Sequence, residues 1–285
     1  MENKESMSRS LKVKRTVAYI VLILITFLCL FPFVILIINT SRSHSQIQKG
    51  FSLVPGKSLV PNINNLMEND NLPVIRAGFN SIYIALFTAA VTSYFSALTA
   101  YAFYAYEFKL KKAAMAFILF VMMIPTQVST LGFLNQMDLF GLTDTFVPLI
   151  FPAVASPVVV FFMYQYLTGY IPKSIIEAAR IDGSSEFATF NKIILPIMKP
   201  ALAVQAIFAF IGSWNNYFTP NLLLDSKHKK TLPILIAQLR SADFMKFDMG
   251  QVYTLIAFSI IPAVIIYLLL SKYIIGGMTL GSVKG

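Results

Sequence analysis

The sequence alternates long apolar blocks with short polar stretches. Six blocks lack Asp, Glu, Lys and Arg and are mostly apolar: 17–38, 77–106, 113–137, 145–172, 200–224 and 249–271. A helix needs about 20 such residues to cross roughly 30 Å of hydrocarbon. The pattern therefore predicts an all-α membrane protein with six transmembrane helices, at about 17–38, 79–104, 113–134, 146–168, 200–224 and 251–272.

Two shorter segments need separate interpretations. Residues 231–239 are uncharged but too few to span, and they contain Pro233, so we expect an interfacial or re-entrant piece of a loop. Residues 50–58 superficially match a phosphate-binding loop. Five residues separate the two glycines where that motif has four, and Pro55 lacks the N–H that a phosphate cradle needs. We predict a turn-rich loop there.

Composition supports the membrane assignment. Hydrophobic residues make up 56% of the 285 positions and charged residues only 13%, whereas soluble chains carry about 25% charged residues. This balance excludes an ordinary soluble domain. The single cysteine, Cys29, excludes an intramolecular disulfide.

The basic residues predict how the chain is oriented. The net charge is +10, but no polar region is large enough to present a basic face to nucleic acid, so we expect no nucleic-acid partner. Placing both termini in the cytoplasm puts 14 of the 23 Lys and Arg residues inside, as the positive-inside rule favours. The domains are then a cytoplasmic tail (1–16), a six-span domain (17–275) and a second cytoplasmic tail (276–285). The loop 225–248 is an exception, because its five basic residues would be external.

Several kinds of chemistry have no candidate residues. All carboxylates and both histidines lie outside the six uncharged blocks, so the spans lack the ionisable group that proton-coupled carriers usually bury. The sequence contains no cluster of ligands at metal spacing and no G-x-S-x-G motif. We therefore expect no metal site and no enzyme active site.

The connection between the fourth and fifth predicted spans carries the most specific signal. Ser174 and Glu177 have the spacing of a capping box, which predicts a helix starting at Ile175. Gly183 interrupts that helix, and a second short helix is expected from about Ser185 to Asn191. The first helix would present a patch of small and branched side chains that another backbone could approach closely, formed by Ile175, Ile176, Ala178 and Ala179.

This connection resembles the EAA loop of permease subunits of binding-protein-dependent ABC importers. The matching positions are Glu177, Ala178, Ala179, Gly183, Ile193, Leu195 and Pro196. Four further stretches are similar to the MalG-type carbohydrate permeases in particular: 32–42, 139–144, 214–220 and 276–285. In that family the loop forms a coupling helix, which sits in a groove of a cytoplasmic ATPase and transmits its closure to the membrane helices.

The resemblance implies a function and a set of partners. The chain would form half of the path for a sugar or oligosaccharide in the bacterial cytoplasmic (inner) membrane, surrounded by lipid. Its partners would be a second, MalF-like permease subunit, a dimer of ATPase subunits and an extracytoplasmic solute-binding protein. ATP and Mg would bind to the ATPase subunits, and this chain would bind no cofactor. A permease for a non-sugar solute and a secondary transporter are the alternatives.

A sugar path needs aromatic faces and amide or hydroxyl groups instead of ion pairs. The candidates are Gln127, Gln205, Trp214, Asn215, Asn216 and Tyr217. Two other roles are open for them. Trp214 and Tyr217 fit an interfacial aromatic belt, and Asn215 and Asn216 fit hydrogen bonds between helices.

Overall fold

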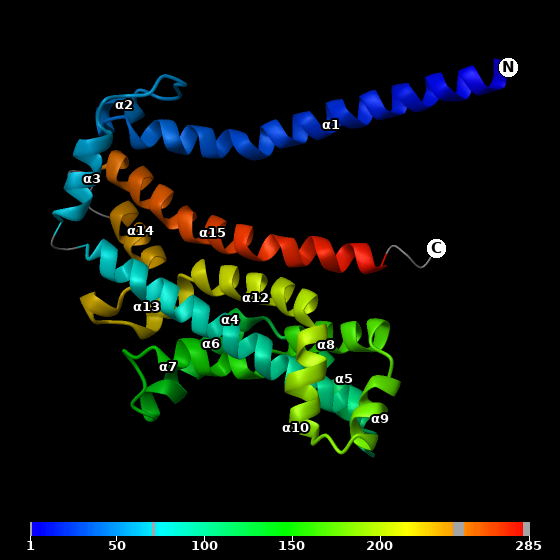
Figure 1. Ribbon diagram of the computed structural model, residues 1–285. Coiled ribbons are helices and arrows are strands. Elements are labelled where there is room, and N and C mark those ends of the chain that lie inside the picture. The colour runs from blue at the N-terminus through cyan, green and yellow to red at the C-terminus, as the bar shows by residue number, and fades with distance from the viewer. Residues whose placement is uncertain (1, 70–71, 242–247, 282–285) are drawn as a thin grey trace. The chain divides into compact units, whose positions relative to one another are not determined.

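A computed structural model describes residues 2–69, 72–241 and 248–281 (Figure 1). Within these ranges the chain is helical and contains no strand. The long helices are α1 (Glu2–Thr40), α4 (Val74–Ala105), α5 (Lys111–Met122), α6 (Thr126–Leu139), α8 (Pro157–Tyr170), α12 (Lys199–Trp214) and α15 (Met249–Gly281). The shorter ones are α2 (His44–Gln48), α3 (Leu59–Met67), α7 (Val147–Ile150), η1 (Phe151–Ala155), α9 (Ser174–Ile181), α10 (Glu186–Thr189), the π-helical η2 (Phe190–Ile194), α11 (Leu195–Ile197), α13 (Phe218–Leu223), η3 (Lys227–Lys229) and α14 (Leu232–Ser241).

The described residues include four helical stretches that are long and apolar enough to cross a membrane. They are Leu11–Thr40, Val74–Ala105, Val147–Tyr170 and Met249–Lys272. A fifth candidate is a pair of helices bent by 81°, Glu186–Ile197 and Lys199–Trp214. The described part of the chain is therefore all-helical with four to five candidate spans, which agrees with the predicted class.

Three of the predicted spans consist of more than one element, and the span expected at 146–168 is made of α7, η1 and α8. The expected helix over 113–134 is wrong as a single element, because α5 ends at Met122 and α6 begins at Thr126. Pro125 lies between them in an extended conformation (ψ 124°), and proline removes a helical N–H and disfavours a helical residue before it. The expected helix over 200–224 also divides, into α12 and α13. At this second break the Asn216 side chain accepts a hydrogen bond from the Thr219 N–H at 3.3 Å, which satisfies one free N–H in the first turn of α13.

The chain divides into two compact units, and the first comprises residues 1–69 and 239–258. Within it, the buried Arg42 guanidinium donates hydrogen bonds to Asn39 Oδ1 at 3.0 Å and to the carbonyl oxygens of Gln46 and Gly50. The Asn62 side chain donates to the Arg42 carbonyl oxygen at 3.0 Å. These bonds fix the loop that follows α1.

The segment that superficially matched a phosphate-binding loop is also tied down in the first unit. The Gly56 N–H donates to the Ser41 hydroxyl at 3.0 Å, and the Ser58 N–H donates to the Ser41 carbonyl oxygen at 2.7 Å. Both amides are therefore occupied within the chain. This agrees with the prediction of a turn-rich loop.

The second unit comprises residues 70–238 and 259–285 and is organised around α4. Every fourth residue on one face of α4 is small and mostly buried, and this spacing lets neighbouring helices approach closely. The stripe consists of Ala77, Ser81, Ala85, Ala89, Ser93 and Ala97. The helices α8 and α12 pack against α4. The short α14 begins within this unit and is too short to span, as expected for residues 231–239.

Candidate functional site

The loop with the EAA pattern begins with α9, but its start differs from the prediction. Lys173 occupies the N-cap position in a helical conformation (φ −60°, ψ −28°), and no side chain caps the first turn. The helix therefore begins at Ser174, one residue earlier than expected, and the predicted capping box between Ser174 and Glu177 is wrong. A capping box needs an extended N-cap residue, which the backbone here does not supply.

The end of α9 agrees with the prediction. Gly183 has a φ of +76°, its N–H donates to the Arg180 carbonyl oxygen at 3.1 Å, and the Ser184 N–H donates to the Ala179 carbonyl oxygen at 3.0 Å. These two bonds form a Schellman motif, in which glycine adopts the left-handed conformation at low cost. Gly183 therefore ends the helix and turns the chain back.

The exposed face of α9 is not the one expected from the sequence. Ile176 and Ala179 are only 2% and 3% exposed and pack inward, so Ala179 is not part of an open docking patch. Glu177 and Ala178 are exposed, and Ile181 at the end of the helix is 86% exposed. Buried Ile176 faces the protein's own core, because an amphipathic helix on a protein surface covers that core with its apolar side. The surface available to a partner is therefore formed by Glu177, Ala178 and Ile181.

An ion pair ties α9 to the segment that follows Gly183. Arg180 Nε lies 2.6 Å from Glu186 Oε1, and the other carboxylate oxygen of Glu186 accepts a hydrogen bond from the Tyr101 hydroxyl at 2.7 Å. The Arg180 guanidinium also lies over the ring of Tyr106, 5.5 Å from its centroid. The hydrogen bond to Glu186 raises the pKa of Arg180, which keeps the guanidinium charged. These contacts hold both halves of the loop against the end of α4.

The second half of the loop starts as predicted and then continues further. The Ser185 hydroxyl caps α10 by accepting a hydrogen bond from the Ala188 N–H at 3.3 Å. A π-helical turn follows, which buries Phe190 and Ile194 in the core, and the chain then bends by 81° into α12. Such turns occur frequently at functional sites. Of the other residues in the pattern, Ile193 and Leu195 pack against this core, whereas Pro196 is exposed.

A pocket of about 560 Å³ lies among the broken helices of the second unit. Among the described residues that line it, the polar groups are hydroxyls and one amide, the aromatic groups are two phenylalanines, and none is charged. The lining residues are Ser129, Thr130, Phe133, Pro148, Leu149, Pro152, Gly212, Asn216, Phe218 and Thr219. Uncharged polar groups beside aromatic faces suit a neutral solute with many hydroxyls.

Of the six path residues suggested by the sequence, the pocket includes Asn216. Trp214 is only 3% exposed, stacks on Phe210 and donates its indole N–H to the Ser259 carbonyl oxygen at 2.9 Å. Trp214 therefore does not line the pocket, and both expectations for it, a path residue and an interfacial belt, stay predictions. It is a packing residue, because its single donor is satisfied inside the protein.

Three of the remaining path candidates are not among the residues that line this pocket. Asn215 and Tyr217 are exposed, and Gln205 is half-buried. The side chain of Gln127 lies outside the described residues. The sequence analysis missed Ser129 and Thr130, although both follow Pro125 closely and hydroxyls beside a helix break are a usable signal. It also missed Tyr101, Arg180 and Glu186.

Known proteins resemble the chain along most of its length. Residues 93–279 match the family of binding-protein-dependent transport system inner membrane components. The arabinooligosaccharides transport system permease protein AraQ of Bacillus subtilis (strain 168) is 34% identical, over 92% of this chain and 93% of that protein. The trehalose/maltose transport system permease protein MalG of Thermococcus litoralis is also 34% identical, over 95% of this chain and 98% of that protein.

The fold is similar to that of a solved structure. A chain of a bacterial ABC transporter involved in the import of the acidic polysaccharide alginate superposes with a TM-score of 0.80, covering 93% of this chain and 98% of that chain at 22% identity. The family match and the relatives indicate the same family, and the solved structure has a similar fold. The chain belongs to the family of inner membrane components of binding-protein-dependent transport systems.

Proposed function

We propose that this chain is the permease subunit of an ATP-driven importer and forms half of the membrane path for a sugar or oligosaccharide. The single observation that carries the proposal is the EAA loop within a chain of this family: a short helix ended by Gly183, followed by a second helical segment. Permease subunits of this family hydrolyse no ATP themselves. A separate ATPase dimer, which binds ATP and Mg, therefore powers transport.

In this proposal α9 is the coupling helix. Glu177 and Ala178 on its exposed face contact the ATPase, and the loop's ties to the end of α4 transmit the movement of the ATPase to a membrane helix. The buried side chains of Ile176 and Ala179 pack the inner face of the helix against the rest of the chain. Gly183, Ile193, Leu195 and Pro196 shape the return of the chain to the membrane.

The proposed topology has six spans with both termini in the cytoplasm. The broken helices supply two of these spans, α5 with α6 and α12 with α13, and the distribution of Lys and Arg supports the orientation. The second permease subunit is MalF-like. An extracytoplasmic binding protein delivers the solute to the side opposite α9.

Cysteine labelling tests this orientation. In a Cys29→Ala background, Thr143→Cys is expected to react with an impermeant thiol reagent in intact cells. Ser184→Cys, in the loop beside Gly183, is expected to react only after the membrane is opened. The reverse pattern would contradict the coupling role of α9.

Reconstitution tests the transport function. The complete complex, with its binding protein and ATPase subunits, is expected to accumulate a neutral sugar in vesicles only when ATP is supplied. Uptake of a charged, non-sugar solute instead would overturn the substrate class. Accumulation driven by an ion gradient without the ATPase would support a secondary transporter.

A further inference from the structure

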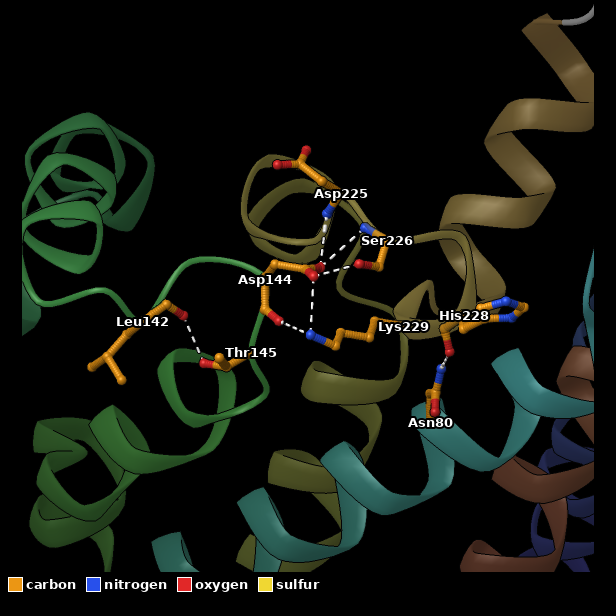
Figure 2. Close-up of polar contacts among 8 residues, drawn as sticks. All are labelled: Asn80, Leu142, Asp144, Thr145, Asp225, Ser226, His228 and Lys229. Atoms are coloured by element: carbon orange, nitrogen blue, oxygen red, sulfur yellow. Dashed lines mark hydrogen bonds and ion pairs between the residues drawn. The ribbon is translucent and has the colours of Figure 1, made fainter.

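The turn after α6 and the loop after α13 meet at one carboxylate (Figure 2). Asp144 Oδ1 accepts hydrogen bonds from the backbone N–H groups of Asp225 and Ser226, at 3.1 and 3.0 Å. Its Oδ2 accepts a hydrogen bond from the Ser226 hydroxyl and lies 2.9 Å from Lys229 Nζ. A carboxylate with four donors is well satisfied, so this contact, which we call the Asp144 clasp, fixes the loop 224–230.

The backbone of Asp144 takes part as well. Its N–H donates to the Leu223 carbonyl oxygen at 2.7 Å, and its own carbonyl oxygen accepts from Lys229 Nζ. Asp144 has a φ of 54° and is the one non-glycine residue with a positive φ in the described part of the chain. Aspartate tolerates this conformation better than most residues, and a strained residue persists where its surroundings hold it.

The same loop is attached to α4. The side-chain amide of Asn80 donates to the carbonyl oxygen of His228 at 2.9 Å (Figure 2). It also donates to the carbonyl oxygen of Lys230 at 3.0 Å. At the next residue of α4, the Ser81 hydroxyl accepts a hydrogen bond from the Leu232 N–H at 2.9 Å. The loop 224–230 and the start of α14 are therefore held by two elements, the turn after α6 and the helix α4.

The short helix α13 connects this clasp to the pocket. Phe218 and Thr219 in its first turn line the pocket, and the carbonyl oxygen of Leu223, its last residue, accepts from the Asp144 N–H. A helix of six residues has little stability of its own, so its position depends on what holds its two ends. Asn216 holds the beginning and Asp144 holds the end.

We propose that Asp144 is a positioning residue for transport: by clasping the loop 224–230 it holds α13 in place as one wall of the pocket through which the solute passes. The solute path itself rests on the proposed function. The clasp contains no group that reaches the pocket, so its effect on the solute is indirect. It also gives a role to Lys229, one of the basic residues in the loop that the orientation rule left unexplained.

The test measures how accessible the pocket wall is in the purified complex with its partner subunit and ATPase. In a Cys29→Ala background, Thr219→Cys reports on the wall by its rate of reaction with a maleimide. Asp144→Gly removes the carboxylate while allowing the left-handed backbone. We expect this variant to raise the reaction rate on the order of tenfold, the effect of losing hydrogen bonds to a charged group. Asp144→Asn keeps one acceptor oxygen and should raise it less.

Asp138→Asn is the matched control, since Asp138 is exposed and its carboxylate has no hydrogen bond or ion pair among the described residues. Its labelling rate should equal that of the parent. Solute uptake and ATP hydrolysis are measured in parallel. The number of solute molecules moved per ATP hydrolysed should fall in Asp144→Gly. A mere loss of folded complex would leave this ratio unchanged.

If Thr219→Cys reacts at the same rate in Asp144→Gly as in the parent, the proposed positioning role of Asp144 is overturned. Failure of the transport function itself would appear differently, as a parent complex that takes up no sugar. The labelling result needs no solute, so the two outcomes are separate.

Discussion

Replacing Gly183 with valine tests whether the turn after α9 sets the coupling geometry. A Cβ placed on Gly183 meets no atom within 4 Å, so the substitution causes no clash. Its effect comes from the φ of +76°, which costs a residue with a Cβ roughly 1–2 kcal/mol. A free energy of this size changes the ratio of two conformations by a factor of about 5–30. The same turn separates Arg180 from Glu186, so a shifted backbone also weakens their ion pair.

The assay uses the complete complex in lipid nanodiscs. ATP hydrolysis is measured with and without solute-loaded binding protein, together with the amount of ATPase that remains bound. We expect Gly183→Val to assemble with its partner subunit but to lose most of the stimulation, by about fivefold or more. Gly183→Asn is the control, because asparagine tolerates the left-handed conformation and should keep most of the stimulation. Full stimulation in the valine variant would refute the reasoning.

Three further predictions follow from the same contacts. Ala178→Trp should leave the subunit folded but prevent stable binding of the ATPase, because Ala178 is exposed. Ala179→Trp should lower the yield of folded subunit, because overpacking a buried site costs about 1–3 kcal/mol. Measuring both the membrane yield and the amount of ATPase retained distinguishes the two effects. Tyr101→Phe should lower the number of solute molecules moved per ATP, because Glu186 loses a hydrogen bond; an unchanged ratio would show that this bond is dispensable. Hydrogen bonds from Ser226 and Lys229 hold the pKa of Asp144 well below its ordinary value of 3.8. The Asp144 clasp should therefore stay intact from pH 8 down to about 4 and weaken only as the pH falls further. The measurement is the difference in maleimide labelling of Thr219→Cys between the parent and Asp144→Asn at each pH.

The features that the sequence predicted correctly depend on neighbouring residues. Uncharged apolar runs are a property of about 20 consecutive positions, and they located the candidate spans. The helix end at Gly183 and the cap at Ser185 each involve hydrogen bonds to residues at most five positions away. Such signals are readable because the partner lies within the same short segment.

The errors arose where a local pattern allowed two outcomes. The spacing of Ser174 and Glu177 permits a capping box, but the box forms only if Ser174 itself is extended, and here Ser174 is the first residue of α9. The short apolar face of α9 permits either an open docking patch or packing against the chain itself. Ile176 packs inward because the end of α4 and the π-helical turn form an apolar core with it, and Ala179, three residues later on the same face of the helix, is buried as well.

The contacts that define the two candidate sites join residues far apart in the chain. Tyr101 and Glu186 are 85 positions apart, as are Asp144 and Lys229. Charge counting alone treated Lys229 as one of several external basic residues that contradicted the orientation rule. In the structure Lys229 binds the Asp144 carboxylate, so it has a structural role in the loop that a count of basic residues does not reveal.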